Sequence, residues 1–420
     1  MLLSQYSSAF ELNEAKGKKV IYNLLNHSIG MIRAASYAEA ERGHALKLPK
    51  DDLSVLIDMD VLVEDEKDDR EKALYYTRKS PFSNPVGYLT IMTCLDCNLK
   101  CEYCSQKHFM NGQKMDDTRS ESIASWASNW IKSNHLQHIT VSIIGGEPLL
   151  NMTPLDIILP VLRQTGAQIA VNVVTNGVLL DTEMVKKLVD LNIEKVQVTL
   201  DGDATTHDQI KHIRREGTFQ TILDGVERCT QAGLEVDIRI NYPKRKKEQA
   251  TNALRALRDL KNKSMIQVYF AEVQTEPFFC SNEMANIIPD FYELAYGMGF
   301  STPGPFGSLL CQAESDHGFT IDPSGVVYKC YNSVGMPHQQ LGEIINGRLL
   351  VKNHAVLNNH PILDCLSCKY FPVCRGGCKH MRQARNLAPN TRMCSYENYR
   401  LAEHRILPLY VGSLLRKSAK

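Results

Sequence analysis

The chain lacks a long apolar run and lacks a charge imbalance. No stretch approaches the roughly 20 apolar residues that cross a membrane. The segment Met1 to Lys19 is largely polar, with Glu11 and Glu14 where a secretory peptide has its apolar core. A net charge of +1 on 420 residues gives no basic face for nucleic acid. We therefore expect a cytoplasmic protein that binds neither a membrane nor nucleic acid.

Cysteine, by contrast, is abundant. The chain has thirteen cysteines, an odd number. In a reducing cytosol, so many clustered cysteines indicate metal ligands and not disulfides. Thiolate-rich sites suit iron–sulfur clusters or zinc. The length is sufficient for two or three domains with a large core.

The most informative cysteines are Cys97, Cys101 and Cys104, which follow the apolar stretch Gly87 to Met92. Their C-x3-C-x2-C spacing provides three thiolates for a cubane cluster, so one iron keeps an open position where chemistry can happen. A structural zinc site that includes Cys94, buried free thiols or a disulfide framework are the alternatives. Spacing alone leaves these alternatives open.

The middle of the chain is typical of βα units stacked around a parallel sheet, because β-branched runs alternate with helical patterns. The expected strands are Gly87 to Met92, Ile139 to Ile143, Ile169 to Val174, Lys195 to Leu200, Glu235 to Asn241 and Ile266 to Glu272. The expected helices are Glu121 to Lys132, Pro154 to Gln164, Thr182 to Leu191, Gln220 to Ala232, Lys247 to Leu260 and Met284 to Tyr296. This predicts an α/β fold with a partial (β/α)6, TIM-like barrel. In such barrels the working residues lie at the carboxyl ends of the strands.

Polar and glycine motifs stand at these strand ends. They are Gly145, Gly146 and Glu147 after the second strand, Thr175 and Asn176 after the third, and Thr199 and Asp201 at the end of the fourth. Arg239 and Asn241 on the fifth strand alternate with apolar neighbours, so they share one face. Singly, each motif is an ordinary turn or a buried polar network. Together and in this order, they predict a ligand site.

The cysteine triad, with its aromatic Tyr103, resembles the signature of radical S-adenosylmethionine (SAM) enzymes. In that family the open iron chelates SAM, and an electron from the cluster splits SAM into methionine and a 5'-deoxyadenosyl radical. The resemblance implies that Gly145, Gly146 and Glu147 contact the SAM amino group through their backbone and acid. It implies that the threonine, asparagine and aspartate positions reach the ribose. It also implies SAM contacts for Tyr103, Arg239 and Asn241.

A second cysteine region begins at Cys311 and resembles the seven-cysteine SPASM domain, which carries auxiliary iron–sulfur clusters. If the ligand positions of that domain are carried over to this chain, the resemblance implies two four-iron clusters. One is held by Cys365, Cys368, Cys374 and Cys394, and the second by Cys311, Cys330 and Cys378. The implied cofactors are therefore three 4Fe–4S clusters and SAM. Zinc is the alternative for Cys365 to Cys378, because two close cysteine pairs can make a structural site.

The second auxiliary cluster lacks a fourth cysteine. Some relatives place one six residues after the Cys311 position, where this chain has His317. We expect His317 or Cys280 to complete the site, or one iron to stay open to a substrate donor. Cys94 and Cys229 have no motif position and are expected to be small packing residues.

Residues 1–83 contain no catalytic constellation. Strand-like pieces at Val20 to Leu25 and Val61 to Val63 flank helical stretches at Ala34 to Arg42 and Pro49 to Ile57, and the charged run Glu64 to Lys72 leads into a linker. This part resembles the small winged-helix-like domains that bind leader peptides, which can add a strand to a sheet edge. A cap that only packs on the barrel is the alternative. We expect the barrel over residues 84–300 and the SPASM domain over 301–420.

The resemblance implies an enzyme that abstracts hydrogen from a ribosomally made precursor peptide, giving a cross-link, decarboxylation or backbone excision. Its implied partners are the peptide, an electron donor such as flavodoxin or ferredoxin, and a separate leader-binding protein. The chain also contains the motif Gly325-x4-Cys330. Sulfatase maturases resemble the chain too, but they carry an Asp that serves as a base immediately after the cysteine of this motif. Here that position is Tyr331, and tyrosine can itself transfer protons, which makes Tyr331 the expected catalytic residue. A non-catalytic iron–sulfur partner subunit is the remaining alternative.

Overall fold

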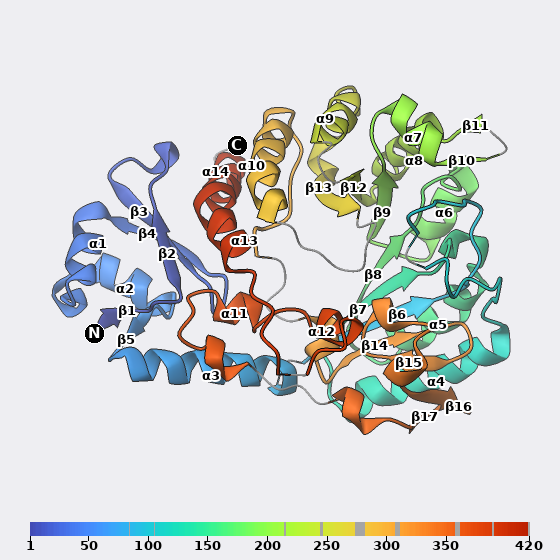
Figure 1. The fold of residues 1–420 in the computed structure, drawn as a ribbon, viewed down its shortest axis with the longest axis horizontal. Helices are drawn as coiled ribbons and strands as arrows, with labels where there is room; N and C mark the ends of the chain where they lie inside the picture. The colour runs from blue at the N-terminus through green and yellow to red at the C-terminus, as the bar shows by residue number, and fades with distance from the viewer. Residues whose placement is uncertain are drawn as a thin grey trace.

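The computed structural model describes the chain except residues 84, 105, 214–215, 244–246, 274–281, 307–310, 358–361, 389 and 419–420. Its centre is a ten-stranded sheet with the order β13-β12-β9-β8-β7-β6-β14-β15-β16-β17. Helices cover the outer side of this sheet, and a smaller unit made from the start of the chain lies beside it (Figure 1).

Six parallel strands form the barrel part of the sheet. They are β6 (Val86–Met92), β7 (His138–Ile144), β8 (Gln168–Val174), β9 (Lys195–Leu200), β12 (Glu235–Pro243) and β13 (Ile266–Val273). The helices between and after them are α4 (Asp117–Ser133), α5 (Thr153–Arg163), α6 (Thr182–Asp190), α7 (Ala204–Ile210), α8 (Phe219–Gln231), α9 (Lys247–Ala256) and α10 (Asn282–Gly297). All six expected strands are confirmed within two residues at either end. The short helix α7 and the hairpin of β10 (His212–Ile213) and β11 (Glu216–Gly217) were not expected.

The two faces of the barrel strands differ in polarity. Val196, Val198 and Leu200 of β9 point toward the helices and are fully buried. Residues on the opposite face of β9, such as Gln197 and Thr199, are polar and only half-buried. Strands β7, β8 and β12 repeat this alternation. A closed TIM barrel fills its interior with branched apolar side chains, so the polar inner face here indicates an interior open to a polar ligand.

The C-terminal cysteine region extends the same sheet. It adds β14 (Gly318–Ile321), β15 (Val326–Tyr328), β16 (Gln340–Ile345) and β17 (Arg348–Val351). Strand β14 pairs with β6 in parallel, and β15, β16 and β17 follow as antiparallel neighbours. The barrel and the cysteine region are therefore joined by backbone hydrogen bonds and not by side-chain packing alone.

The N-terminal unit combines two small sheets with three helices. Its elements are β1 (Leu2–Leu3), β2 (Ser7–Phe10), β3 (Lys18–Asn23), β4 (Ile29–Arg33), α1 (Ala34–Glu41), α2 (Lys50–Asp58), β5 (Leu62–Val63) and α3 (Glu66–Ser83). Strands β2, β3 and β4 form one antiparallel sheet, and β1 pairs with β5. The expected strands and helices of this part are present, but β1, β2 and β4 were missed.

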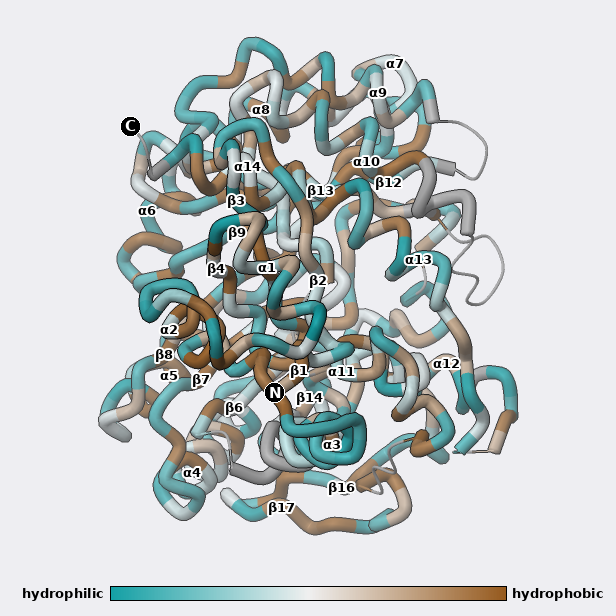
Figure 2. The backbone as a smooth tube through the Cα atoms, turned by 90° about the vertical axis from the view of Figure 1, so that its left-hand side faces the viewer, coloured by the Kyte–Doolittle hydropathy of each residue, from teal (hydrophilic) through white to brown (hydrophobic). Residues whose placement is uncertain are grey.

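The charged run expected to lead into a linker instead begins the long helix α3. Three acids lie in its first turn, where they favour the positive end of the helix dipole. Figure 2 shows α3 as largely hydrophilic along its course. Its buried Asp69 accepts hydrogen bonds from the Ser4 hydroxyl at 2.6 Å and the Gln5 N–H at 2.7 Å. The run is therefore a helix that fastens the start of the chain.

The three-stranded N-terminal sheet serves two cores. Ile21 and Ile32 belong to a local core with Leu56 and Met59. Tyr22, on the opposite face, belongs to the main core of the molecule, and its ring centroid lies 5.5 Å from that of Phe306. The N-terminal unit is thus both a small folded body and a packed neighbour of the rest.

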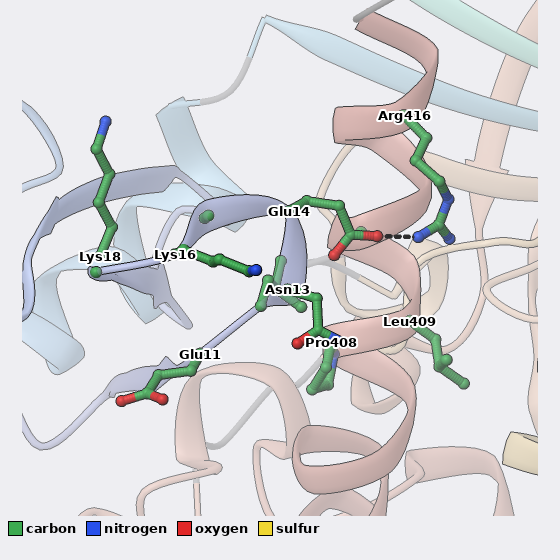
Figure 3. Close-up of a pocket in the computed structure, with 12 residues that line it drawn as sticks. Glu11, Asn13, Glu14, Lys16, Lys18, Pro408, Leu409 and Arg416 are labelled. Atoms are coloured by element: carbon green, nitrogen blue, oxygen red, sulfur yellow. Dashed lines mark hydrogen bonds and ion pairs between the residues drawn. The ribbon is translucent and has the colours of Figure 1, made fainter.

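A C-terminal helix also contacts the N-terminal unit (Figure 3). Helix α13 (Tyr396–Leu401), a π-helical turn (Ala402–Ile406) and α14 (Leu407–Ser418) close the sequence. Arg416 of α14 pairs with Glu14 beside a cavity of about 460 Å³ (Figure 3). None of the helices in the described part of the chain has the length and apolar character of a membrane span.

Candidate active site at the carboxyl ends of the strands

The cysteine triad lies on the loop after β6. The Cys97 sulfur accepts hydrogen bonds from the Leu99 N–H at 3.4 Å and from Nδ2 of Asn176 at 3.7 Å. Burial raises the pKa of Cys97 to about 11. Burial also raises the pKa of Cys101, against the lowering effect of the Lys211 charge. Hydrogen bonds to sulfur are among the means by which proteins tune iron–sulfur clusters, so this loop fits such a cluster.

Gly145 and Gly146 are required by the packing of this loop. A Cβ on Gly145 would lie 2.6 Å from the Cys94 carbonyl oxygen, and one on Gly146 would lie 2.1 Å from the Asp96 carbonyl oxygen. The Gly146 N–H donates to the Cys94 oxygen at 3.0 Å, and the Glu147 N–H donates to the Asp96 oxygen at 2.7 Å. Cys94 is fully buried there, and Cys229 is equally buried in α8, as packing residues are.

Glu147 joins the strand-end turns to one another. Its carboxylate is fully buried and accepts hydrogen bonds from the Leu149 N–H at 3.0 Å, the Thr175 hydroxyl at 2.7 Å and the Asn176 N–H at 2.7 Å. Burial raises the pKa of this carboxyl group. Both oxygens are engaged within the protein, which gives the acid a structural task that the sequence did not reveal.

A buried polar network surrounds Asp201, which is 1% exposed. The Tyr103 hydroxyl donates to the Asp201 carboxylate at 2.7 Å, and Nδ2 of Asn241 donates to it at 3.0 Å. Nε of Arg239 donates to Oδ1 of Asn241 at 2.9 Å. The structure thus links the cysteine loop with the ends of β9 and β12, and it brings these four expected site residues together.

Lys211 completes the network and was missed in the sequence. Its ammonium group lies 3.0 Å from the Asp201 carboxylate and 3.0 Å from the Thr199 carbonyl oxygen, and its side chain is 5% exposed. It follows α7 outside every recognised motif, so no sequence signal marked it. A buried lysine beside a buried carboxylate is retained only when the two are paired.

His207 supports the same turn. Its Nδ1 accepts the Asp201 N–H at 3.2 Å, and its Nε2 lies 3.1 Å from the Thr218 hydroxyl. Burial lowers the pKa of this fully buried imidazole to about 4. The ring is therefore neutral near pH 7 and can accept the Asp201 N–H.

Tyr331 extends from the C-terminal region toward the inner face of the barrel. It lies on a short 3-10 turn after Cys330 and is 49% exposed. Tyr269 of β13 is the register partner of Arg239 on β12. Burial raises the pKa of Tyr269 to about 12, and the charges of Arg239 and Tyr331 act on it as well. Tyr331 therefore borders the wall that carries Arg239.

The seven C-terminal cysteines form two groups. Burial raises the pKa of Cys330 to about 12, and the neighbouring Cys311 and Cys378 thiols raise it further. Burial likewise raises the pKa of Cys374, with contributions from Cys365, Cys368 and Cys394. That these cysteines hold two clusters, as the SPASM resemblance implies, stays a prediction.

The backbone after Cys374 has a geometry that keeps Cys394 close to this part of the chain. Arg375, Gly376 and Gly377 have successive positive φ values of 52°, 86° and 102°. A Cβ on Gly377 would lie 2.5 Å from the Met393 carbonyl oxygen, and the Met393 N–H donates to the Gly376 oxygen at 2.9 Å. These contacts bring Cys394 beside Cys374 and Cys378.

The two named candidates for a fourth ligand have different outcomes. The His317 ring lies against α4, with its centroid 6.4 Å from that of Trp130, and its pKa is lowered by burial. Cys280 lies outside the described residues. No three His, Cys, Asp or Glu side chains of the described residues converge as a single metal ion requires.

Residues 91–266 match the radical SAM superfamily. The chain carries a radical SAM domain. The match begins within β6 and ends at the start of β13, and it encloses the cysteine triad, the glycine turn and the Asp201 network. The thiol donors and their N–H···S bonds fit the iron–sulfur cluster of that superfamily, whose members are enzymes.

Curated relatives share this domain only. The chain is 29% identical over 165 residues to GTP 3',8-cyclase of Clostridium perfringens (strain SM101 / Type A), which is 38% of this chain and 48% of the relative. It is 29% identical over 154 residues to Fe-coproporphyrin III synthase of Methanosarcina barkeri (strain Fusaro / DSM 804), 35% of each. The chain spans about half the length of the cyclase and about a third of the synthase, so these likenesses concern the radical SAM domain.

Solved structures resemble a larger part of the fold. The protein anSMEcpe with bound AdoMet has a TM-score of 0.58 at 19% identity and covers 78% of this chain and 98% of its own. SuiB of Streptococcus suis, bound to S-adenosylmethionine, has a TM-score of 0.55 at 14% identity and covers 94% and 99%. At these identities the likeness concerns the fold, which places the radical SAM domain within a larger shared architecture.

Proposed function

We propose that the protein is a radical SAM peptide maturase, which cleaves SAM and abstracts hydrogen from a ribosomally made precursor peptide. The observation that carries the proposal is the Asp201 network, which joins the cysteine loop to the polar inner face of the sheet. Fixed polar groups at strand ends, with an open interior beyond them, suit a charged cofactor and a polar substrate.

Cys97, Cys101 and Cys104 would hold the radical SAM cluster, which would supply the electron for the cleavage of SAM into methionine and a 5'-deoxyadenosyl radical. The chain's own residues orient SAM and exclude water. Lys211 offers a cation for the SAM carboxylate, and Asn241 and Arg239 offer donors for the carboxylate or ribose. Because the Glu147 carboxylate is engaged internally, the backbone of its turn is the better partner for the SAM amino group.

A peptide substrate is favoured by the form of the inner wall and by the structural likenesses. The polar face of β7, β8, β9 and β12 is half-buried and continuous with the strand ends. A solved structure of SuiB bound to precursor peptide SuiA covers 94% of this chain with a TM-score of 0.54. The small N-terminal sheet is within that architecture, and sheet edges commonly take peptides as an added strand.

The C-terminal cysteines and Tyr331 serve the later part of the reaction. The two cysteine groups would hold auxiliary four-iron clusters, and such clusters would supply an acceptor for the surplus electron. Tyr331 interacts with Cys330 and with Arg239, and its hydroxyl can relay a proton from the substrate by releasing its own proton as it receives one. The position is half-exposed, so a substrate can reach it.

Formylglycine generation is the second candidate, favoured by the TM-score of 0.58 with anSMEcpe. The residue after Cys330 distinguishes the two candidate functions, because this chain has Tyr331 where sulfatase maturases have an Asp that serves as a base. A sulfatase-derived peptide and a precursor peptide encoded beside this gene, offered in parallel, would separate the two by mass spectrometry.

The decisive test is anaerobic reconstitution of the wild type and of the Cys97/Cys101/Cys104 triple alanine variant. We expect about twelve irons per chain to fall to about eight, and 5'-deoxyadenosine to form from SAM only in the wild type. Failure of the wild type to release 5'-deoxyadenosine under strong reductant would refute the enzyme proposal. It would instead favour an iron–sulfur partner subunit.

A further inference from the structure

A polar cavity lies toward the amino ends of the barrel strands, at the other end from the Asp201 network. It has a volume of about 750 Å³ and is lined by residues of β8, β9 and β12. These strands are neighbours in the sheet (Figure 1). Asn172, Lys195 and Asp237 belong to the lining, one from each strand. The cavity is therefore formed by the same strands that carry the SAM site.

The strand register places these side chains on the inner face of the barrel. Lys195 of β9 is the register partner of Asn172 on β8 and of Glu235 on β12. Asp237 stands two residues further along β12 and so faces the same side as Glu235. The next residue on β9, Val196, is fully buried on the opposite face. The polar side chains thus gather inside the barrel at the cavity.

The charges that line the cavity do not balance. The lining holds two cations and three acids, which are Arg163, Lys195, Glu194, Glu235 and Asp237. The Arg163 guanidinium donates to two backbone carbonyl oxygens before β9, at 2.6 Å and 3.3 Å. The Lys195 ammonium lies 3.3 Å from Glu235 and 3.3 Å from Asp237. One ammonium group therefore serves two carboxylates, and negative charge is in excess.

Asp237 is the acid least satisfied by this arrangement. Its side chain is 18% exposed, and burial raises its pKa against the lowering effect of Lys195. Among the described residues, Oδ1 of Asp237 and Oδ1 of Asn172 are buried atoms without a hydrogen-bond partner. Both atoms are acceptors, and a buried acceptor without a donor is costly. A cationic group with N–H donors would meet both demands.

Asp237 is also at a useful distance from the SAM end. Asp237, Arg239 and Asn241 share one face of β12. At about 3.3 Å per residue, Asp237 lies about 7 Å along the strand from Arg239 and about 13 Å from Asn241. Arg239 donates through Nε to Asn241 at 2.9 Å, so its guanidinium is directed away from Asp237. An extended lysine or arginine side chain that reaches Asp237 would keep its backbone nearer the strand ends.

We propose that Asp237, together with Asn172 and Glu235, binds a cationic side chain of the peptide substrate, a lysine or an arginine. The bound residue is then the one that loses hydrogen or its neighbour. The inference rests on the proposed function, because it takes a peptide to enter the barrel. Lys195 occupies the carboxylates in the free protein and competes with the incoming cation. The competing interpretation is an ion pair that only fastens β9 to β12, since the amino ends of closed barrels serve stability.

The test uses four acetylated tripeptide amides, with lysine, arginine, norleucine or glutamate between two alanines. Ligand-observed NMR titration measures their dissociation constants for the reconstituted full chain with SAM and without reductant. We expect the lysine and arginine peptides to bind about tenfold more tightly than the norleucine peptide, as a hydrogen bond to a charged group allows. The glutamate peptide should bind most weakly.

Two variants at the ion pair should change binding in opposite directions. Asp237→Asn should remove the preference for lysine over norleucine. Lys195→Met should bind the lysine peptide several-fold more tightly, because it removes the competing ammonium group. A merely structural ion pair would not produce that gain. Asp259→Asn, which changes an exposed acid outside the cavity, is the matched control and should behave as the wild type.

Equal binding of the lysine and norleucine peptides by the wild type, or no binding of either, would overturn the proposal. So would an Asp237→Asn variant that keeps the preference for lysine. Weaker binding of the lysine peptide by Lys195→Met would assign the ion pair to stability alone. Reductant added to the same samples tests the proposed function separately. If 5'-deoxyadenosine forms while the lysine preference is absent, only this inference fails.

Discussion

At the scale of single residues, the site depends on buried charges that satisfy one another. Asp201 receives hydrogen bonds from Tyr103, Asn241 and Lys211. Glu147 receives them from its own turn and from the turn that follows β8. Removing one partner of such a pair leaves an uncompensated charge, at a cost of about 3 to 5 kcal/mol. The residues that shape this site are therefore also residues that stabilise the fold.

His207 should make stability depend on pH. Burial lowers its pKa to about 4, whereas an unfolded histidine titrates near 6.5. As the pH falls from about 6.5 to about 4, the unfolded chain binds a proton that the folded chain does not, so stability decreases through this window. At about 1.4 kcal/mol per pH unit, the full loss is about 3 kcal/mol.

Urea unfolding of the wild type and of His207→Gln across this window measures the effect. The difference in unfolding free energy between the wild type and His207→Gln should decrease as the pH falls, because only the wild type loses the contribution of His207. If the unfolding free energies of the two proteins change with pH in the same way, the His207 ring is not the source of the pH dependence.

Gly146→Ala should displace the radical SAM cysteine loop. The new Cβ would lie 2.1 Å from the backbone oxygen of Asp96, which cannot move without the loop. We expect the reconstituted variant to lose about four of about twelve irons together with SAM cleavage. Gly297→Ala is the control, since no atom lies within 4 Å of its added Cβ. Retention of full iron content by Gly146→Ala would show that the loop tolerates the shift.

At the scale of elements, what could be predicted from the sequence follows the strength of local patterns. The barrel strands are β-branched runs with alternating burial, so their positions were predictable. Strand β14 has four residues that are all buried, and its partner β6 lies more than 200 residues earlier. No local period reports such a pairing. Likewise, spacing marked the cysteines, while Lys211 acquires its place in the Asp201 network only through its tertiary neighbours.

The π-helical turn between α13 and α14 anchors the cysteine region. Its Glu403 is 7% exposed, accepts a hydrogen bond from Lys369 at 2.6 Å and another from Tyr370. These donors directly follow Cys368. Burial alone would raise the pKa of Glu403, but the two donors hold it below its ordinary value.

Glu403→Gln should therefore cost about 2 kcal/mol of unfolding free energy, the usual scale for hydrogen bonds to a charged group. Urea denaturation measures it. Glu397→Gln is the matched control, because its pair with Arg400 is about half-exposed and should contribute less than about 1 kcal/mol. Equal costs for the two variants would contradict the anchoring role.

At the scale of the whole molecule, packing and not surface charge should hold the N-terminal unit. Arg416 and Glu14 are 53% and 30% exposed in their pair, and exposed pairs contribute about 1 kcal/mol or less. Tyr22, 4% exposed, packs against Phe306 within the main core. Removal of a buried aromatic side chain costs about 3 to 5 kcal/mol.

We thus expect Tyr22→Ala to lower the unfolding free energy several-fold more than Arg416→Ala. Urea denaturation of both variants decides the comparison. Limited proteolysis should detach the N-terminal unit in Tyr22→Ala first. A larger effect of Arg416→Ala would show that the ion pair of Arg416 with Glu14, and not the packing of Tyr22, is the main contact that holds the N-terminal unit.

The shared sheet sets a fixed spacing between the strand that precedes the cysteine triad and the strands of the C-terminal cysteine region. Thr320 of β14 pairs with Thr90 of β6 on one side and with Tyr328 of β15 on the other. Two strand spacings of about 4.8 Å separate β6 from β15 by about 10 Å, and no hinge interrupts this path. Peptide docking cannot draw these strands apart without breaking backbone pairing. With clusters in both regions, as the proposed function requires, electrons would pass between them at a rate set by this fixed distance. No part of the protein would have to move to carry them.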